Sequence, residues 1–260
     1  MSALQGKVAV VTGGGGGIGA AVCRRLAHDG ALVAVVDVDG AAAARLAAEL
    51  GADTFPIEAD VAREEDVVRY IREIVDRFGR IDHHHLNAGI AGELTFLPDA
   101  SVGEFDQVMA VNVRGAFLGV REAFRQYAVQ GSTGSIVVTA SICSFGGGAD
   151  LVAYHTSKHA LVGLVRSAAV YGGPLGIRVN AVAPGIVPTN LLGTPSVSSG
   201  GDAGTTARSR LAPLRRAGTP AEIANVVAFL LADESAFVTG SVYSVDGGAV
   251  AVNPVRPYVE

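Results

Sequence analysis

The fold is decided by residues 8–19, which read VAVVTGGGGGIG. An apolar run typical of a buried strand leads into consecutive glycines, and a helix-like segment follows. Such a turn lets a pyrophosphate approach bare backbone and the positive end of the helix. We therefore expect Gly13, Gly17 and Gly19 to shape a dinucleotide-binding loop. A flexible glycine linker is the alternative, but a linker has no need of the flanking strand and helix.

Strand-like and helix-like segments alternate along the rest of the chain. The apolar runs lie near residues 8–12, 32–36, 53–57, 81–86, 135–140, 177–182 and 241–245. This alternation predicts an α/β fold, a doubly wound Rossmann-type parallel sheet of about seven strands with helices on both faces. Right-handed crossovers then place the carboxyl ends of the strands at one edge, where ligands of such sheets bind.

Length and composition fit a single domain over residues 1–260. Hydrophobic residues make up 49% and charged residues 17%, which suits aliphatic strands buried on both faces. A net charge of -5 without a visible Lys/Arg cluster argues against nucleic acid as a partner, and no apolar run approaches the ~20 residues that span a membrane. With two cysteines, Cys23 and Cys143, and no leader-like segment, we expect a cytoplasmic protein without a metal site.

Asp37 ends the second strand-like run, close to the ~20-residue offset from the glycine loop at which a carboxylate meets the adenosine ribose. Its oxygens can accept hydrogen bonds from both ribose hydroxyls of NAD and would repel the 2′-phosphate of NADP. Residues 14–16 are glycines and offer no cationic side chain. The pattern favours NAD as the cofactor, the alternative being a solvated aspartate at a strand end.

Tyr154 and Lys158 stand four residues apart, so on a helix they share one face. Ser141 precedes the tyrosine by thirteen residues, at the end of a strand-like run. A phenol with a pKa of about 10 is a poor base near neutrality, and lowering that pKa by about three units requires roughly 4 kcal/mol. Lys158 and a positively charged nicotinamide could supply this stabilisation. Singly, a strand-end serine, a surface tyrosine and a solvated lysine are also ordinary.

Together these motifs resemble the short-chain dehydrogenase/reductase family in its single-domain, NAD-dependent form, over nearly the whole chain. The resemblance is carried by Thr-Gly-x3-Gly-x-Gly at residues 12–19, Asn-Ala-Gly at residues 87–89 and Pro-Gly-x3-Thr at residues 184–189. Four further residues match the catalytic tetrad of that family, namely Asn112, Ser141, Tyr154 and Lys158.

The resemblance implies a role for each matching residue. Tyr154 would be the general acid/base, Ser141 would bind the substrate oxygen, Lys158 would hold the nicotinamide ribose, and Asn112 would anchor a water that relays protons. A substrate lid would occupy about 189–214, and helices near 103–128 and 153–172 would build a homotetramer. The implied cofactor contacts are Gly13, Gly17, Ile18, Gly19, Asp37, Asp60, Val61, Asn87, Gly89, Tyr154, Lys158, Pro184, Gly185, Val187 and Thr189.

The fourth strand-like run departs from the family, which normally has apolar residues there, because it contains His83, His84 and His85. Leu86 also replaces the first asparagine of the usual Asn-Asn-Ala-Gly. Consecutive residues on a strand point to opposite faces, so the three imidazoles cannot converge on one metal ion. We expect buried, hydrogen-bonded neutral imidazoles or a locally remodelled strand.

The sequence predicts an NAD(H)-dependent oxidoreductase that interconverts a secondary alcohol and a ketone. An NAD(H)-binding sensor or scaffold is the main alternative, although it has no need of a complete tetrad. An epimerase or dehydratase is a third possibility, disfavoured by the lack of an additional substrate domain. An apolar pocket for a cyclic or otherwise bulky alcohol is expected from Phe145, residues 146–148, Leu151, Ile186, Leu191 and Leu192.

Overall fold

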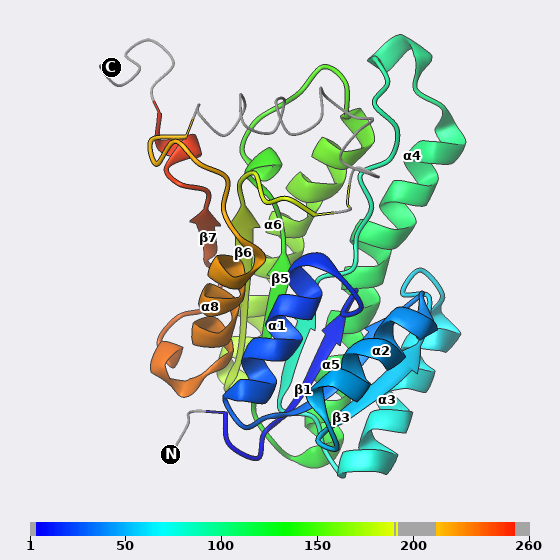
Figure 1. Ribbon diagram of the computed structural model, residues 1–260, viewed down its shortest axis with the longest axis vertical. Coiled ribbons are helices and arrows are strands. Elements are labelled where there is room, and N and C mark those ends of the chain that lie inside the picture. The colour runs from blue at the N-terminus through cyan, green and yellow to red at the C-terminus, as the bar shows by residue number, and fades with distance from the viewer. Residues whose placement is uncertain (1–3, 190, 192–211, 253–260) are drawn as a thin grey trace.

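A seven-stranded sheet lies at the centre of the computed structural model, which describes residues 4–189, 191 and 212–252 (Figure 1). All neighbouring strands are parallel, in the order β3-β2-β1-β4-β5-β6-β7. Each predicted apolar run overlaps one strand, which confirms the predicted Rossmann-type fold. The strands are β1 (Val8–Thr12), β2 (Leu32–Asp37), β3 (Thr54–Glu58), β4 (His83–Leu86), β5 (Gly134–Thr139), β6 (Ile177–Pro184) and β7 (Val242–Val245).

Helices cover both faces of the sheet, because most strands present apolar side chains to both sides. Alternate residues of β1 belong to two different hydrophobic clusters, Val8 and Val10 to one and Ala9 and Val11 to the other. One face is covered by α1 (Gly17–His28), α2 (Gly40–Leu50) and α8 (Pro220–Leu231), and the other by α3 (Glu64–Phe78), α5 (Gly115–Gln130) and α6 (Val152–Gly172).

The ends of these helices follow from local sequence. At α8, the Thr219 side chain and Glu222 form a reciprocal capping box, with Pro220 in the first turn. At α3, acidic residues occupy the first turn, where they complement the helix dipole, and Gly79 ends the helix in the left-handed conformation. Short 3-10 helices complete the connections at Leu97–Asp99, Ile142–Ser144, Gly173–Leu175, Asp233–Ser235 and Ala249–Ala251.

The helix expected near 103–128 is interrupted. It consists of α4 (Val102–Met109), a π-helical segment Ala110–Arg114 and α5. Such single-turn π segments are frequently found at functional sites, and this one contains Asn112.

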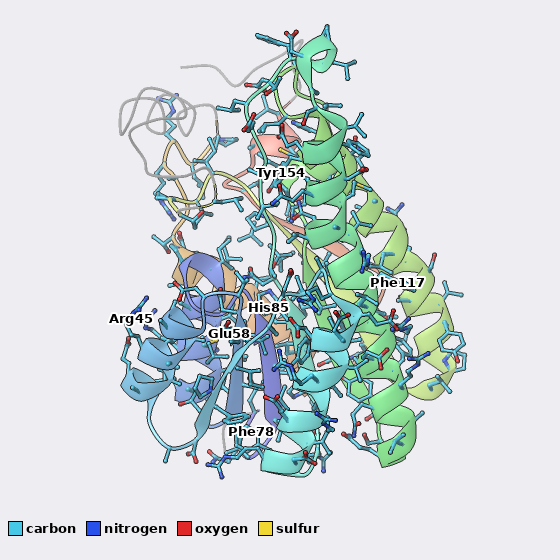
Figure 2. The ribbon with its side chains drawn as sticks, turned by 90° about the vertical axis from the view of Figure 1, so that its right-hand side faces the viewer. Arg45, Glu58, Phe78, His85, Phe117 and Tyr154 are labelled. Atoms are coloured by element: carbon cyan, nitrogen blue, oxygen red, sulfur yellow. The ribbon has the colours of Figure 1, made fainter. Side chains whose placement is uncertain are left out.

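The carboxyl ends of β1 and β4 form the switch point of the sheet, because the chain leaves these neighbours toward opposite edges. Figure 2 places Tyr154 well above His85, which lies among the strands. The predicted lid at 189–214 falls mainly outside the described residues.

All three histidines of β4 are buried, with His84 and His85 fully enclosed. His83 Nδ1 lies 2.7 Å from Ser135 Oγ, and His84 Nε2 lies 3.2 Å from the Tyr70 hydroxyl. In each imidazole of β4 the second nitrogen has no hydrogen-bond partner among the described residues. Burial lowers the pKa of His83 to about 4 and the pKa values of His84 and His85 to about 3. The expectation of buried, hydrogen-bonded neutral imidazoles is confirmed.

These lowered pKa values predict a loss of stability in mild acid. Between a pKa of about 6.5 in the unfolded chain and the folded values, only the unfolded chain is protonated at these positions. The full contribution to the free energy of unfolding is therefore present above about pH 6.5. It decreases as the pH is lowered from about 6.5 toward the folded-state pKa values, by up to about 1.4 kcal/mol per pH unit for each histidine. Urea unfolding at a series of pH values measures this slope.

Carboxylates also contribute to the pH dependence of stability, so the contribution of one histidine is measured by replacing it. His84→Leu should reduce the slope by about one histidine's share, whereas His159→Gln, at an exposed position of α6, should leave it unchanged. An identical slope in the parent and in His84→Leu would contradict the assignment.

Candidate active site

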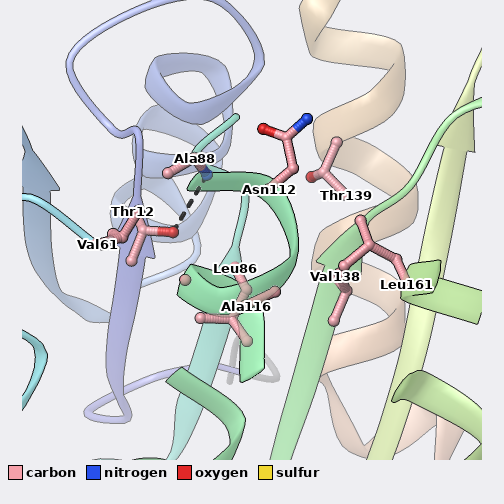
Figure 3. A pocket seen from close by; sticks show the side chains of 10 residues that line it. Thr12, Val61, Leu86, Ala88, Asn112, Ala116, Val138, Thr139 and Leu161 are labelled. Atoms are coloured by element: carbon pink, nitrogen blue, oxygen red, sulfur yellow. Dashed lines mark hydrogen bonds between the residues drawn. The ribbon is translucent and has the colours of Figure 1, made fainter. Parts of the chain in front are cut away.

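The glycine loop is fastened to the end of β4 by side chains. Asn87 Nδ2 donates to the carbonyl oxygens of Thr12 and Gly13, each at 3.2 Å. Thr12 Oγ1 accepts from the backbone N–H of Asn87 at 3.0 Å and of Ala88 at 3.2 Å, the latter drawn in Figure 3. A Cβ at Gly19 would overlap the carbonyl oxygen of Gly13, so only glycine fits. The loop therefore presents bare backbone, as the diphosphate of a dinucleotide requires.

Asp37 lies against this loop from the end of β2. Its Oδ2 accepts from the Gly15 N–H at 2.8 Å, and its Oδ1 accepts from the Asp39 N–H at 3.0 Å. A Cβ at Gly15 would lie 2.8 Å from the Ala42 Cβ and 3.0 Å from Asp37 Oδ2. The half-buried carboxylate thus faces a loop without a cation, as the sequence predicted for a ribose acceptor.

Asp60 and Val61 follow β3 and precede α3. Asp60 Oδ1 accepts from the Ala62 N–H at 2.9 Å, and its own N–H donates to Asp66 Oδ2 at 3.0 Å. Val61 is buried against Gly115, at the start of α5. The two residues form a fixed turn at the same edge of the sheet.

The Pro-Gly-x3-Thr segment at residues 184–189 passes beside the glycine loop. Gly185 lies so close to Asp246 that a Cβ would be 2.7 Å from the Asp246 Cα. A Cβ at Gly17 would lie 3.3 Å from Thr189 Cγ2, which brings both ends of the predicted cofactor site together. The core beside α1 and α8 packs against the side chains of two further predicted residues, Ile18 and Val187.

Tyr154 and Lys158 share one face of α6, as their spacing predicted. Lys158 Nζ lies 5.5 Å from the centroid of the Tyr154 ring and donates to the Thr139 carbonyl oxygen at 2.8 Å. A Cβ at Gly89 would lie 3.1 Å from Asn112 Oδ1 and 3.6 Å from Lys158 Nζ. The tyrosine, the lysine and the asparagine therefore surround one small volume at the carboxyl edge of the sheet.

Asn112 reaches this volume from the π-helical segment, but its side chain serves the protein framework. Its Oδ1 accepts from the Ile90 N–H at 2.8 Å, and its Nδ2 donates to the Ile90 carbonyl and to Ser157 Oγ, each at 2.9 Å. Ser157 Oγ donates in turn to the Tyr154 carbonyl at 2.7 Å. Asn112 thus links the loop after β4 to the helix that carries the tyrosine.

Burial dominates the electrostatics of the tetrad. It raises the pKa of Tyr154 to about 12, an effect that the charge of Cys143 enhances and a hydrogen bond with Ser141 reduces. It lowers the pKa of Lys158 to about 8. In the protein alone, desolvation acts against the lowering of the tyrosine pKa that was expected from Lys158 together with a positively charged nicotinamide. That lowering stays a prediction.

The sequence does not predict several residues of the site's hydrogen-bonded framework. Ser144 Oγ donates to the Lys158 carbonyl at 2.7 Å, and Ser141 Oγ accepts from the Cys143 N–H at 3.1 Å. These bonds join side chains to backbone, which no motif spacing reveals. The overlooked residues are Thr139, Ser144 and Ser157.

Behind the tetrad the interior is closely packed. A cavity of about 10 Å³, roughly the size of one water molecule, is lined by Thr12, Asn112, Thr139 and apolar neighbours such as Leu161 (Figure 3). A ligand must therefore approach from the open edge of the sheet.

The residues expected to form an apolar pocket do not meet in one enclosed cavity within the described residues. Ile186 lines a hollow of about 480 Å³ together with Leu214. Phe145 and Leu191 are 47% and 42% exposed. Leu192 lies outside the described residues.

The sheet, the glycine loop and the Tyr-x3-Lys helix define a Rossmann-type oxidoreductase. The sequence model of the family described as Enoyl-(Acyl carrier protein) reductase matches residues 13–250. Levodione reductase of Leifsonia aquatica is 38% identical over 94% of both chains, and 2,5-dichloro-2,5-cyclohexadiene-1,4-diol dehydrogenase of Sphingobium indicum is 38% identical over 97% of this chain and 100% of that one.

Solved structures agree. The crystal structure of levodione reductase superposes with a TM-score of 0.92 at 36% identity, covering 96% of this chain and 100% of that chain. The 3-ketoacyl-(acyl-carrier-protein) reductase of Brucella melitensis, complexed with NADH, gives a TM-score of 0.87 at 31% identity, covering 95% and 99%. The chain belongs to the short-chain dehydrogenase/reductase family, and it is an oxidoreductase that acts on CH–OH groups.

Proposed function

We propose that the protein interconverts a secondary alcohol and a ketone with NAD(H), using Tyr154 as the general acid/base. The observation that carries this proposal is the position of Lys158, whose Nζ lies over the Tyr154 ring and also beside Gly89, in the loop after β4 at the switch point of the sheet. A cradle at Gly19 that a Cβ would fill, together with the Asp37 carboxylate, fits a dinucleotide. When bound, the cofactor supplies a hydride acceptor or donor.

Side chains of the tetrad would bind the substrate oxygen and transfer its proton. The Ser141 hydroxyl hydrogen-bonds the substrate oxygen, and the Tyr154 hydroxyl exchanges a proton with that oxygen. With its pKa near 12, Tyr154 is neutral at neutral pH and ready to donate a proton during ketone reduction. Alcohol oxidation needs the phenolate, which requires roughly 7 kcal/mol of stabilisation at neutral pH. The Lys158 ammonium over the ring, and a positive nicotinamide, are the charges that would provide it.

The tyrosine role predicts a clear separation between turnover and binding. Tyr154→Phe removes the proton-carrying oxygen and keeps the ring, so kcat should fall by at least about two decades while the Kd for NAD changes little. Lys158→Ala should impair both. NADH absorbance and calorimetry measure the two quantities. Tyr171→Phe, an exposed site on the same helix, is the matched control, and a Tyr154→Phe variant that retains most activity would refute the mechanism. A sensor or scaffold would show no such contrast.

Cofactor choice is proposed to rest on Asp37, which supports NAD over NADP. Loss of charge-assisted hydrogen bonds to the ribose costs about 10–100-fold in binding. Asp37→Ser should therefore lower kcat/KM with NAD by about tenfold or more and narrow the preference over NADP.

The neighbouring Asp39 provides the control for this experiment. Its side chain caps α2 by accepting from the Ala42 N–H, so Asp39→Ser should alter stability and leave cofactor preference intact. An unchanged preference in Asp37→Ser would remove its assigned role.

The substrate is proposed to be a cyclic or otherwise bulky alcohol or ketone. This is supported by the apolar side chains around the open edge and by relatives whose names specify levodione and a cyclohexadienediol. A panel of cyclic and linear secondary alcohols with NAD, and of the matching ketones with NADH, tests the class and the preferred direction.

A cytoplasmic homotetramer built through α5 and α6 is proposed as the assembled form. Apolar side chains on these helices remain exposed, including Phe117, Val129, Val170 and Tyr171, the last two 80% and 69% exposed. Such a surface is typical of an interface between subunits. Among the described residues, no helix has the length and apolar character needed to cross a membrane.

Sedimentation should give a mass close to four chains at micromolar concentration. Val170→Asp should lower that mass, because a charge would be buried in the interface. Val68→Asp, on the exposed side of α3, should not. A parent protein that sediments as a monomer overturns the proposed assembly.

A further inference from the structure

The His85 imidazole lies at the start of a hydrogen-bond chain that runs through the active-site framework. Its Nε2 is 2.9 Å from Thr139 Oγ1, and the Thr139 hydroxyl donates to Asn87 Oδ1 at 3.1 Å. A threonine hydroxyl has a single proton. Because that proton goes to Asn87, Thr139 must accept from the imidazole, which fixes the hydrogen of His85 on Nε2.

Asn87 carries the chain onward to the glycine loop. With its Oδ1 held by the hydroxyl, its Nδ2 faces the loop and donates to the carbonyls of Thr12 and Gly13. The backbone of Thr139 meets the other half of the site, since its carbonyl accepts from Lys158 Nζ. Thr139 therefore joins the cofactor loop to the lysine, and His85 is the donor that orients its hydroxyl.

We propose that His85 is a positioning residue, which orients Thr139 and Asn87 and thereby holds the glycine loop in its dinucleotide-binding shape. The ligand class rests on the proposed function. A leucine at this position would fill the space but leave the Thr139 hydroxyl without a donor. Without that donor the hydroxyl is no longer held in one orientation, which weakens its bond to Asn87 Oδ1 and with it the orientation of the amide toward the Thr12 and Gly13 carbonyls.

A comparison with His83 distinguishes the positioning role of His85 from the effect of burying an imidazole. Like His85, His83 lies on β4, is buried and bonds a hydroxyl. It is at the opposite end of the strand, however, and its partner Ser135 donates to the carbonyl of Leu231, the last residue of α8. His83 is thus linked through Ser135 to the end of α8, and within the described residues it has no hydrogen bond to the glycine loop. It is the matched control.

The experiment compares His85→Leu, His85→Gln and His83→Leu with the parent. His85→Leu should weaken NAD binding by about tenfold in calorimetry, and kcat/KM should fall with it. His85→Gln, whose amide N–H can replace Nε2–H, should recover most of the affinity. His83→Leu should lower Tm and leave the Kd for NAD unchanged. Parent-like binding by His85→Leu, or equal weakening by His83→Leu, overturns the proposal.

Hydrogen exchange of the cofactor-free protein tests the same role without turnover. The backbone amides of residues 13–19 should exchange faster in His85→Leu than in the parent, and not in His83→Leu. If His85→Leu does not fold, Thr139→Val removes the same relay with almost no change in shape and should show the same faster exchange. Parent-like exchange in that variant overturns the proposal. A parent that binds no NAD refutes the proposed function instead, and the exchange contrast still decides the role of His85.

Discussion

The hydrogen bonds between Thr12 and Asn87 join the ends of β1 and β4, which are 75 residues apart in the sequence. The Thr12 hydroxyl accepts from two successive backbone N–H groups, and the Asn87 amide returns two bonds to the start of the glycine loop. This joint lies at the switch point of the sheet, so every bound dinucleotide would rest on it. Asp37 approaches the loop from β2, and Lys158 is tied to Thr139 on β5. Both halves of the site are therefore positioned relative to one partly buried polar junction.

The sequence predicted the fold because its signals are local and repeat along the chain. Apolar runs marked all seven strands to within about two residues, and the parallel order follows from the alternation with helices. The π-helical segment was missed because a shift from i+4 to i+5 bonding in one turn leaves no periodic trace. It matters nonetheless, since it places Asn112 where the side chain can bond Ile90 and Ser157.

The site was predictable in its chemistry but not in its environment. Spacing placed Tyr154 and Lys158 on one helical face, and in the structure Lys158 Nζ lies over the Tyr154 ring and beside Gly89. Burial could not be read from the sequence, and burial raises the pKa of Tyr154 rather than lowering it. The framework hydroxyls of Thr139, Ser144 and Ser157 were missed for a related reason. The Ser144 and Ser157 hydroxyls donate to backbone carbonyls, and the Thr139 hydroxyl bonds the side chains of His85 and Asn87. These partners come within reach only after the chain has folded.

The histidines of β4 show how differently three adjacent imidazoles can serve one strand. Each leaves one buried nitrogen without a hydrogen-bond partner in the described part of the chain, and such a group costs about 1–3 kcal/mol. His84 packs edge to face against the Tyr70 ring, and His83 reaches the C-terminal end of α8 through Ser135, so both act within the protein framework. The bond from His85 leads instead to Thr139 and Asn87, at the switch point. All three imidazoles are therefore buried at a cost. His83 and His84 contact only the protein framework, whereas the hydrogen bonds of His85 lead toward the cofactor loop.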